Sequence, residues 1–405
     1  MKIYEVGGAV RDGLLGRAVA DRDYVVVGGT PEEMLAQGFR PVGRDFPVFL
    51  HPQTNDEYAL ARTERKSGRG YRGFTFHAAP EVTLEADLAR RDLTINAIAR
   101  AADGTLVDPF GGEADLRARV LRHVSAAFAE DPLRVLRVAR FAARLDFTVA
   151  PETEALLRAI VDSGELATLA PERVWQEVAR ALMEERPSRF FALLRRCGAL
   201  ASLLPEVDAL FGVPQPVAHH PEVDTGVHVL QALDFAAAAG DALPVRYAVL
   251  THDLGKGTTP RSKWPTHIGH EARSVLLAEA LAQRLRVPTE CRELARLAAR
   301  YHGVVQRAAE LRPSTLLDLL LASDALRRPE RLDGLLQACA ADALSRQGES
   351  TSPFAPRERL EAALEIVRGV DAGKIAAKRL PASDLPARIR TARLRALREW
   401  LRKVG

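Results

Sequence analysis

The feature that most constrains this chain is a glycine turn near its start, followed by two closely spaced carboxylates. The turn spans residues 7–12 (GGAVRD), and Asp21 and Asp23 come just before an apolar run at residues 25–27 (VVV). Residues two apart in a strand point to the same side of a sheet, so we expect these carboxylates to lie together. Two adjacent like charges are costly unless a cation lies between them, and carboxylate oxygens suit Mg²⁺.

An isolated Asp-x-Asp usually marks a solvated turn, but the residues around this one favour a site. Glycines let the backbone approach a phosphate, and Arg11 could bind one through its guanidinium. Glu57 could add a third carboxylate, although a glutamate at the start of a strand is more often simply exposed. The combination predicts metal-dependent transfer of a nucleotidyl group.

The composition is that of a globular protein with several domains. The chain has 405 residues, is 47% hydrophobic and 27% charged, and carries a formal charge of +4. Its length predicts two to four domains, and the mild basicity fits a polyanionic partner without proving one. The three cysteines are far apart, which argues against a disulfide framework and for a reducing compartment. We see no signal peptide and no uncharged run of membrane-spanning length, and we therefore expect a cytoplasmic protein with no membrane contact.

The hydrophobic periodicity changes along the chain. Up to about residue 125, strand-like runs alternate with glycine turns, and candidate strands lie at residues 3–6, 24–27, 48–50, 57–61 and 105–108. From about Pro132 onward the pattern is almost entirely helical. The expected architecture is a small α/β head on a long α-helical body.

Two further segments of the head carry clustered charge. Residues 63–73 combine three glycines with four cations, which is typical either of a solvated surface loop or of a loop that closes over phosphates or RNA. Arg91 and Asp92 follow in an Arg-Arg-Asp segment. Asp92 could cap a helix over residues 93–99, and Arg91 could clamp a phosphate or form a capping ion pair.

A helix is predicted to begin at Asp131, with Asp131 as its N-cap and Pro132 as its first residue. Arg134, Arg137 and Arg140 then form a polar stripe opposite an apolar face. The stripe could simply be solvated. Alternatively, an aspartate can accept from the exocyclic amine of cytosine or adenine while an arginine donates to their ring acceptors, so such a helix could select C and A without a template.

These elements, in this order, resemble the bacterial class II tRNA nucleotidyltransferases, the CCA-adding enzymes. The resemblance covers at least residues 1–212 and implies a tRNA 3′ end, CTP and ATP as partners, with release of pyrophosphate. It implies that Asp21 and Asp23 hold the catalytic Mg²⁺ and that Asp131 and Arg134 pair with the incoming base. It also implies that helices including residues 171–177 bind the tRNA acceptor end. The remaining implied nucleotide contacts are Gly8, Arg11, Arg91, Arg137 and Arg140.

A second group of chemically active residues lies further along. His228, the adjacent pair His252-Asp253 and the distal Asp324 are accompanied by three more histidines, His267, His270 and His302. A single histidine on a helix is usually structural, but a His-Asp pair with an upstream histidine and a distal aspartate is much less so. Imidazole and carboxylate together suit a transition metal, whose bound water would attack a phosphoester.

This second group resembles the HD-domain phosphohydrolases over residues 225–330. The resemblance implies that His228, His252, Asp253 and Asp324 are metal ligands, and that His267, His270 and His302 serve a second site or contact phosphate. CCA-adding enzymes with such a domain look like the multifunctional form of some proteobacteria. That form implies 2′,3′-cyclic phosphodiesterase, 2′-nucleotidase and phosphatase activities with Ni²⁺ or a similar ion.

The expected fold is therefore a polymerase-β-like α/β head with a mixed sheet, an elongated all-α neck and body, and an all-α HD domain. We expect boundaries at 1–125 for the head, 126–212 for the neck and body, 213–345 for the HD domain and 346–405 for a basic helical tail. The tail carries ten Lys and Arg against three acids from residue 371 onward, which suggests RNA contact. We expect a monomer or a homodimer.

Two alternatives remain open at this point. A poly(A) polymerase would share the head, and head residues alone discriminate poorly between the two. A chain that is mainly an HD nucleotide hydrolase could instead carry a head that only binds RNA or nucleotide. The intact Asp21 and Asp23 argue against that second alternative, and the HD domain argues against the first.

Overall fold

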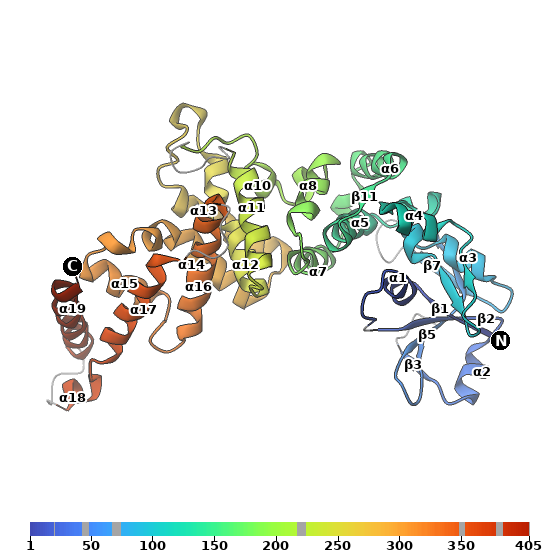
Figure 1. Ribbon diagram of the computed structural model, residues 1–405, viewed down its shortest axis with the longest axis horizontal. Coiled ribbons are helices and arrows are strands. Elements are labelled where there is room, and N and C mark those ends of the chain that lie inside the picture. Colours follow the sequence, from blue (N-terminus) through green and yellow to red (C-terminus); the bar gives the residue numbers. More distant parts are fainter. Residues whose placement is uncertain are drawn as a thin grey trace. The chain divides into compact units, whose positions relative to one another are not determined.

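The computed structural model describes residues 1–19, 21–42, 48–66, 74–216, 224–347, 353–377 and 384–404 (Figure 1). The chain forms two compact units. The first comprises residues 1–178 and 189–203, and the second comprises residues 179–188 and 204–405.

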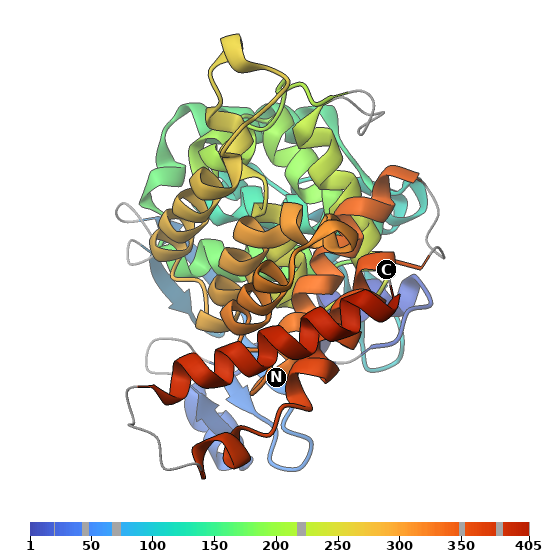
Figure 2. The same cartoon turned by 90° about the vertical axis from the view of Figure 1, so that its left-hand side faces the viewer.

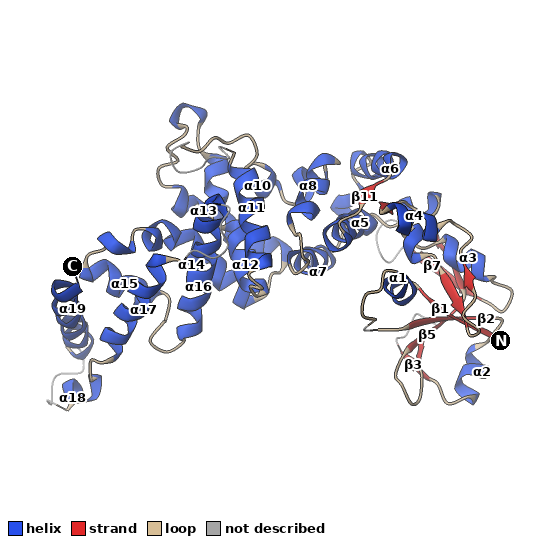
Figure 3. Ribbon diagram, in the orientation of Figure 1, coloured by secondary structure: helices blue, strands red, loops and turns tan. Residues whose placement is uncertain are grey.

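The first unit contains a seven-stranded mixed sheet in the order β3-β4-β5-β2-β1-β8-β9 (Figure 3). Only the β2–β5 pair is parallel among these, and the other neighbours run antiparallel. A β6–β7 hairpin and a short β10–β11 pair complete the strands described here. The strand bounds are β1 Lys2–Val6, β2 Asp23–Val27, β3 Arg40–Val42, β4 Val48–Leu50, β5 Glu57–Leu60, β6 Arg62–Lys66, β7 Phe74–Ala78, β8 Ala99–Ala101, β9 Leu106–Val107, β10 Val120–Leu121 and β11 Thr148–Val149.

The helices of the first unit surround this sheet and then continue as a helical body. They are α1 Gly8–Leu14, α2 Pro31–Ala36, α3 Leu84–Ala89, α4 Gly112–Ala118, α5 Leu133–Leu145, α6 Pro151–Asp162, α7 Pro171–Leu182, α8 Ser188–Arg196 and α9 Ala199–Leu203, with 3₁₀ turns at η2 Thr94–Asn96, η3 Ala126–Glu130 and η4 Glu165–Thr168. The C-terminal end of α7 and the first residue of α8 belong to the second unit.

The apolar run that follows the carboxylates is buried on both sides of the sheet. Val25 joins a core cluster with Val6 and Leu88, whereas Val26 joins a separate cluster with Met34 and Phe49. Because successive strand residues point to opposite faces, a strand covered on both faces reads as a continuous apolar run. The five strands predicted from the sequence are all present, whereas β3, β6, β7, β8, β10 and β11 were not predicted.

The helix predicted over residues 93–99 is wrong. Only one 3₁₀ turn, η2, forms there, and β8 begins at Ala99. Ala99 pairs with Val6 of β1, so pairing within the sheet prevails over local helix propensity. The predicted loop at 63–73 begins as strand β6 and continues into residues 67–73, which lie outside the described residues.

The second unit is helical throughout its described part. Its helices are α10 Pro205–Asp208, α11 Thr225–Ala238, α12 Leu243–Thr251, α13 His270–Leu285, α14 Thr289–Gln306, α15 Pro313–Ala322, α16 Pro329–Leu344, α17 Ala355–Arg368, α18 Ala372–Ala376 and α19 Leu385–Val404, with 3₁₀ turns at η5 Leu254–Thr258, η6 Arg261–Lys263, η7 Ala308–Glu310 and η8 Ser345–Gln347. Helices α12, α14 and α16 pack on one another, and α11 packs against α12 and α16. Among the described helices, none has the length and apolar character needed to cross a lipid bilayer.

Two candidate active sites

A cavity of about 570 Å³ opens in the first unit beside the glycine turn. Its walls come from the start of α1, the first residues of β2 and β5, the Arg-Arg-Asp segment and α5. Most of the predicted nucleotide and metal residues line it, namely Gly8, Arg11, Asp23, Arg91, Asp131, Arg134, Arg137 and Arg140. Nine arginines against four carboxylates make the cavity a site for a strongly anionic ligand.

The two carboxylates after the glycine turn are close but do not share a strand. Strand β2 begins at Asp23, and Asp21 lies in the segment before it, so the expectation that both are strand residues is wrong. In the parallel β2–β5 register Asp23 stands beside Glu57, which also lines the cavity. Partial burial raises the pKa of Asp23; Arg91 opposes this rise and Asp21 adds to it. A cation bound by these oxygens would relieve this repulsion, so the donor set fits Mg²⁺.

Gly7 and Arg11 shape the phosphate side of the cavity. Gly7 has a φ of 72°, and a Cβ atom there would lie 3.0 Å from a guanidinium nitrogen of Arg91, so the turn requires glycine. Arg11 is only 3% exposed, and burial lowers the pKa of its guanidinium against the attraction of Asp12. Its Nη1 donates to Asn96 at 2.6 Å, while its Nε donates to Asp12 at 2.8 Å.

A chain of hydrogen bonds joins this turn to α5. The Asn96 amide donates to Asp92 at 2.9 Å, and Arg137 donates from Nε to the other oxygen of Asp92 at 2.8 Å. Asp92 also accepts from the backbone N–H of Leu93 at 2.8 Å. Asn96 therefore lies between a cation and a carboxylate and satisfies both. Asn96 was not among the predicted site residues, because nothing in its local sequence indicates its distant partners.

Helix α5 begins one residue later than predicted, at Leu133, with Pro132 in place of Asp131 as its N-cap. Asp131 still accepts from the backbone N–H of Leu133 at 3.0 Å and pairs with Arg173 at 3.2 Å. The predicted apolar face is buried, as its periodicity required.

The three predicted arginines of α5 contact other protein groups and do not form a solvated stripe. Arg140 is buried and donates to Glu177 at 2.6 Å, and Arg134 donates to the backbone carbonyls of Ala127 and Arg90. With Arg137 on Asp92, all three arginines have protein partners that fix their directions. Arg173 and Glu177 come from α7, where the sequence had indicated only a helix that binds the tRNA acceptor end.

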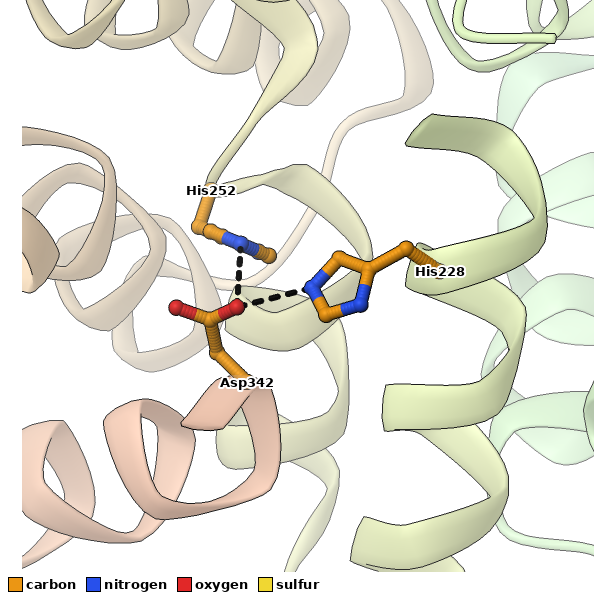
Figure 4. A group of neighbouring side chains, drawn as sticks. All are labelled: His228, His252 and Asp342. Atoms are coloured by element: carbon orange, nitrogen blue, oxygen red, sulfur yellow. Dashed lines mark hydrogen bonds and ion pairs between the residues drawn. The ribbon is translucent and has the colours of Figure 1, made fainter. Parts of the chain in front are cut away.

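The second candidate site lies among the helices of the second unit. His228 on α11, His252 at the end of α12 and Asp342 on α16 converge (Figure 4). The distances to one Asp342 oxygen are 2.8 Å from His228 Nε2 and 3.7 Å from His252 Nε2. All three side chains are buried. Their three ligand atoms lie within 4.8 Å of one another, which suits one metal ion.

The prediction of Asp324 as a metal ligand is corrected, because the carboxylate that joins His228 and His252 is that of Asp342. Asp324 follows the end of α15 with a φ of 55°, and its carboxylate pairs with Arg327 at 2.7 Å. It therefore has the role of a helix-terminating residue in the left-handed region, which aspartate tolerates. The signal for Asp342 was its position at a buried place in the periodicity of α16, seven residues after Leu335 and three after Cys339.

A second group adjoins the first through Asp253. It consists of Asp253, His270 and His302, whose ligand atoms also lie within 4.8 Å of one another. Asp253 faces both groups, with one oxygen 3.2 Å from His252 Nε2 and the other 3.2 Å from His270 Nε2. The three predicted residues His228, His252 and Asp253 are thus brought together. His270 and His302 lie directly beside them.

The histidines in these groups are oriented as metal ligands usually are. His252, His270 and His302 each place Nδ1 near a backbone carbonyl, at 2.8, 3.0 and 3.0 Å, which directs Nε2 into the cluster. Among the described residues, His252 Nε2 and one oxygen of Asp253 are buried without a hydrogen-bond partner. A bound divalent cation would satisfy both atoms, so the residues fit a metal.

The charges of the cluster are strongly coupled. Burial disfavours protonated His252, but Asp253 and Asp342 outweigh it and raise its pKa to about 10. Burial lowers the pKa of His302 to about 4, with Asp253 opposing this fall. Lys256 pairs with Asp253 at 2.6 Å and donates to Gln215 at 2.6 Å. His267 instead bonds the backbone carbonyl of Pro214 at 2.8 Å and belongs to neither group.

Three family models match successive parts of the chain. They are the poly A polymerase head domain over residues 3–122, the probable RNA and SrmB binding site of polymerase A over 146–211, and the HD domain over 225–347. The multifunctional CCA protein of Azoarcus sp. (strain BH72) is 62% identical over 98% of this chain and 97% of its own length. That of Dechloromonas aromatica (strain RCB) is 61% identical over 100% of this chain and 98% of its own length.

The chain belongs to the multifunctional CCA proteins. It is accordingly a tRNA nucleotidyltransferase with an HD domain, as the sequence predicted. Among solved structures it is similar to the CCA-adding enzyme of Bacillus stearothermophilus in complex with CTP, with a TM-score of 0.64 and 24% identity over 99% of this chain and 93% of that one. The solved structure of a CCA-adding enzyme with ATP has a TM-score of 0.61 and 20% identity over 98% of this chain and 86% of that one. At these identities the likeness shows the fold, which is the one predicted for this chain from its sequence.

Proposed function

We propose that this enzyme adds and repairs the 3′-terminal CCA of tRNA from CTP and ATP without a nucleic-acid template. The observation that carries this proposal is the arginine-lined cavity, which joins the glycine turn, Asp23 and α5 in one space. The identity of about 62% to multifunctional CCA proteins supports CCA addition over a poly(A) polymerase. We further propose that it works in the cytoplasm, with the head, neck and body, HD domain and tail divided as predicted.

In this proposal each group in the cavity has a distinct task. Asp21 and Asp23 would hold Mg²⁺, which when bound supplies a Lewis acid for the primer 3′-OH and the triphosphate. Gly8 and Arg11, with Arg91, would bind the triphosphate. The primer oxygen attacks the α-phosphorus in line, and pyrophosphate leaves. Since the arginines are already held by protein partners, positioning and charge stabilisation contribute most of the rate.

The start of α5 would select the base. Asp131 can accept from the exocyclic amine of cytosine or adenine, and Arg134 can donate to a ring acceptor. Asp131 is held by Arg173, and Arg134 is held by backbone carbonyls, so both groups have fixed directions. Arg137 and Arg140 would support this helix end through Asp92 and Glu177.

The decisive test is incorporation into tRNA shortened by one, two or three nucleotides, with CTP or ATP supplied alone. We expect C addition to the two shorter substrates with CTP, and A addition only where one nucleotide is missing. Failure to incorporate C would contradict CCA addition and favour a poly(A) polymerase. An Asp21→Ala variant that kept full activity would contradict the proposed Mg²⁺ site.

For the HD domain we propose hydrolysis of phosphoesters, as a 2′,3′-cyclic phosphodiesterase, 2′-nucleotidase and phosphatase. His228, His252, Asp253 and Asp342 would hold Ni²⁺ or a similar divalent ion, which when bound supplies an activated water. His270 and His302 would contact either a second ion or the substrate phosphate. A His252→Ala variant should lose hydrolysis of 2′,3′-cyclic AMP, and retained hydrolysis would contradict the assignment.

A further inference from the structure

Helix α19, the last helix of the chain, has two unlike faces. It spans Leu385–Val404 and packs against α15 and α17 of the same unit, and it is the long red helix that faces the viewer in Figure 2. Leu397 on its inner side is completely buried. Two polar contacts also hold it: Arg390 pairs with Asp318 of α15 at 2.7 Å, and Arg359 of α17 lies over Trp400 at 5.7 Å.

The outer face of α19 is a row of exposed cations. The helix carries seven cations and one carboxylate, Glu399. Those exposed are Arg388, Arg395, Arg398, Arg402 and Lys403. Residues seven apart return to nearly the same side of a helix, so Arg388, Arg395 and Arg402 form a straight stripe opposite Leu397. At 1.5 Å per residue this stripe is about 21 Å long.

Among the described residues, one carboxylate of α19 lies within this stripe. Glu399 pairs with Arg395 at 2.8 Å and also attracts Arg402 and Lys403. Arg388, Arg398 and Arg402 form no ion pair with any residue that the structure describes. Three exposed arginines without an ion pair on one helix repel one another and destabilise it. Because these side chains point to solvent, Arg388→Gln or Arg402→Gln would leave the packing of α19 untouched. The arrangement is understandable if an extended polyanion binds across the stripe, since guanidinium groups bind phosphates in bidentate fashion.

We propose that the outer face of α19 is an RNA-binding surface that contacts the phosphate backbone of the tRNA substrate. The apolar side of α19 is covered by α15 and α17, so it is not free to enter a lipid surface as an amphipathic membrane helix would. A regular row of cations without a recognition pocket matches a repeating backbone and reads no sequence. The identity of the RNA rests on the proposed function, whereas the surface itself rests on the geometry of α19.

The test compares Arg388→Gln/Arg402→Gln with two matched controls in the full-length enzyme. Arg388→Lys/Arg402→Lys keeps both charges, and Arg296→Gln/Arg300→Gln removes two exposed charges from α14 instead. Binding of tRNA that lacks CCA is measured by filter binding at several salt concentrations, together with kcat and KM for CTP and tRNA. Circular dichroism and the thermal midpoint confirm that each variant is folded.

We expect the α19 glutamine variant to bind tRNA about tenfold more weakly. The slope of the logarithm of the binding constant against the logarithm of salt concentration should be shallower by about two, one for each lost phosphate contact. KM for tRNA should rise in parallel while kcat, KM for CTP and hydrolysis of 2′,3′-cyclic AMP stay unchanged. The lysine variant should bind nearly as the wild type does. Unchanged tRNA binding, or an equal loss in the α14 control, would overturn the proposal.

A lipid partner is tested in the same series with vesicles of phosphatidylserine and phosphatidylcholine. Vesicle binding that depends on Arg388 and Arg402, with tRNA binding unchanged, would also overturn the proposal. The result remains distinct from the test of CCA addition. An enzyme that binds tRNA through α19 but incorporates no C would contradict the proposed function and leave this surface standing.

Discussion

Asp342 and Asp324 are chemically identical and differ only in where the fold places them. Asp342 lies at a buried position of α16 against His228, whereas Asp324 ends α15 and pairs with Arg327. We expect Asp342→Asn to lower phosphoester hydrolysis by at least about 100-fold, because a metal ligand is lost together with its charge. Asp324→Asn should retain most activity. Calorimetric titration of each variant with Ni²⁺ would check the cause, and equal losses in both variants would contradict the assignment.

Asp92 predicts a dependence of stability on pH. Burial alone would raise its pKa, but Arg137 and the hydrogen bonds from Asn96 and Arg137 hold it well below its usual range. A carboxylate with a lowered pKa in the folded state stabilises that state above its unfolded pKa, about 3.9. This contribution is lost as pH falls below that value.

We therefore expect Asp92→Asn to be less stable than the wild type by roughly 3 kcal/mol at pH 7, because Arg137 loses a buried charged partner. Thermal midpoints measured between pH 3 and pH 8 should show a constant difference above about pH 5 that narrows below pH 4. A difference that stayed the same at the lowest pH would show that the charge of Asp92 contributes little.

At the scale of single elements, α5 carries the choice of base in the proposed mechanism. Asp131→Asn replaces a pure acceptor by a group that both donates and accepts, so UTP and GTP should be rejected less well. We expect the preference for CTP over UTP to fall about tenfold or more, with little change in stability. The ratio of kcat/KM for the four nucleotides is the measurement. An unchanged ratio would place base selection elsewhere in the cavity.

The sequence predicted those elements well that neighbouring residues determine, and it predicted poorly those that distant residues determine. The periodicity of α5 and the five apolar strands are local patterns, and the structure contains all of them. The helix predicted at 93–99 had acceptable local propensity, but Ala99 instead pairs with Val6 of β1, more than ninety residues away in sequence. Asn96 was missed for the same reason, because its partners are distant and no neighbouring residue indicates them. Asp342 had a local signal only in its buried place within the periodicity of α16, which does not indicate its histidine partners.

The delayed start of α5 and the corrected position of Asp21 show a smaller limit of the same kind. In both cases the error lies in the boundary of the element. Asp131 still binds the first turn of α5 without being its N-cap. Boundaries depend on a few hydrogen bonds whose alternatives differ little in free energy, whereas the identity of a charged residue in a motif does not.

At the scale of the whole molecule, the two candidate sites belong to different units of the chain and to different donor chemistries. Asp23 and its neighbours offer only carboxylate oxygens, whereas the HD cluster offers imidazoles together with carboxylates. Hard oxygen donors suit Mg²⁺, and imidazole donors suit Ni²⁺ and other transition metals. The two activities should therefore depend on different ions and be separable by single substitutions.

Removal and replacement of metal tests this separation in one protein. After treatment with EDTA and dialysis, we expect Mg²⁺ to restore nucleotide incorporation and Ni²⁺ to restore hydrolysis of 2′,3′-cyclic AMP. Asp253→Asn should abolish the recovery of hydrolysis and leave that of nucleotide incorporation, because Asp253 faces both histidine groups and is not one of the residues that line the cavity of the head. Asp23→Asn should do the reverse. If either substitution removed both activities, the two sites would be coupled, and the assignment of one chemistry to each unit would be wrong.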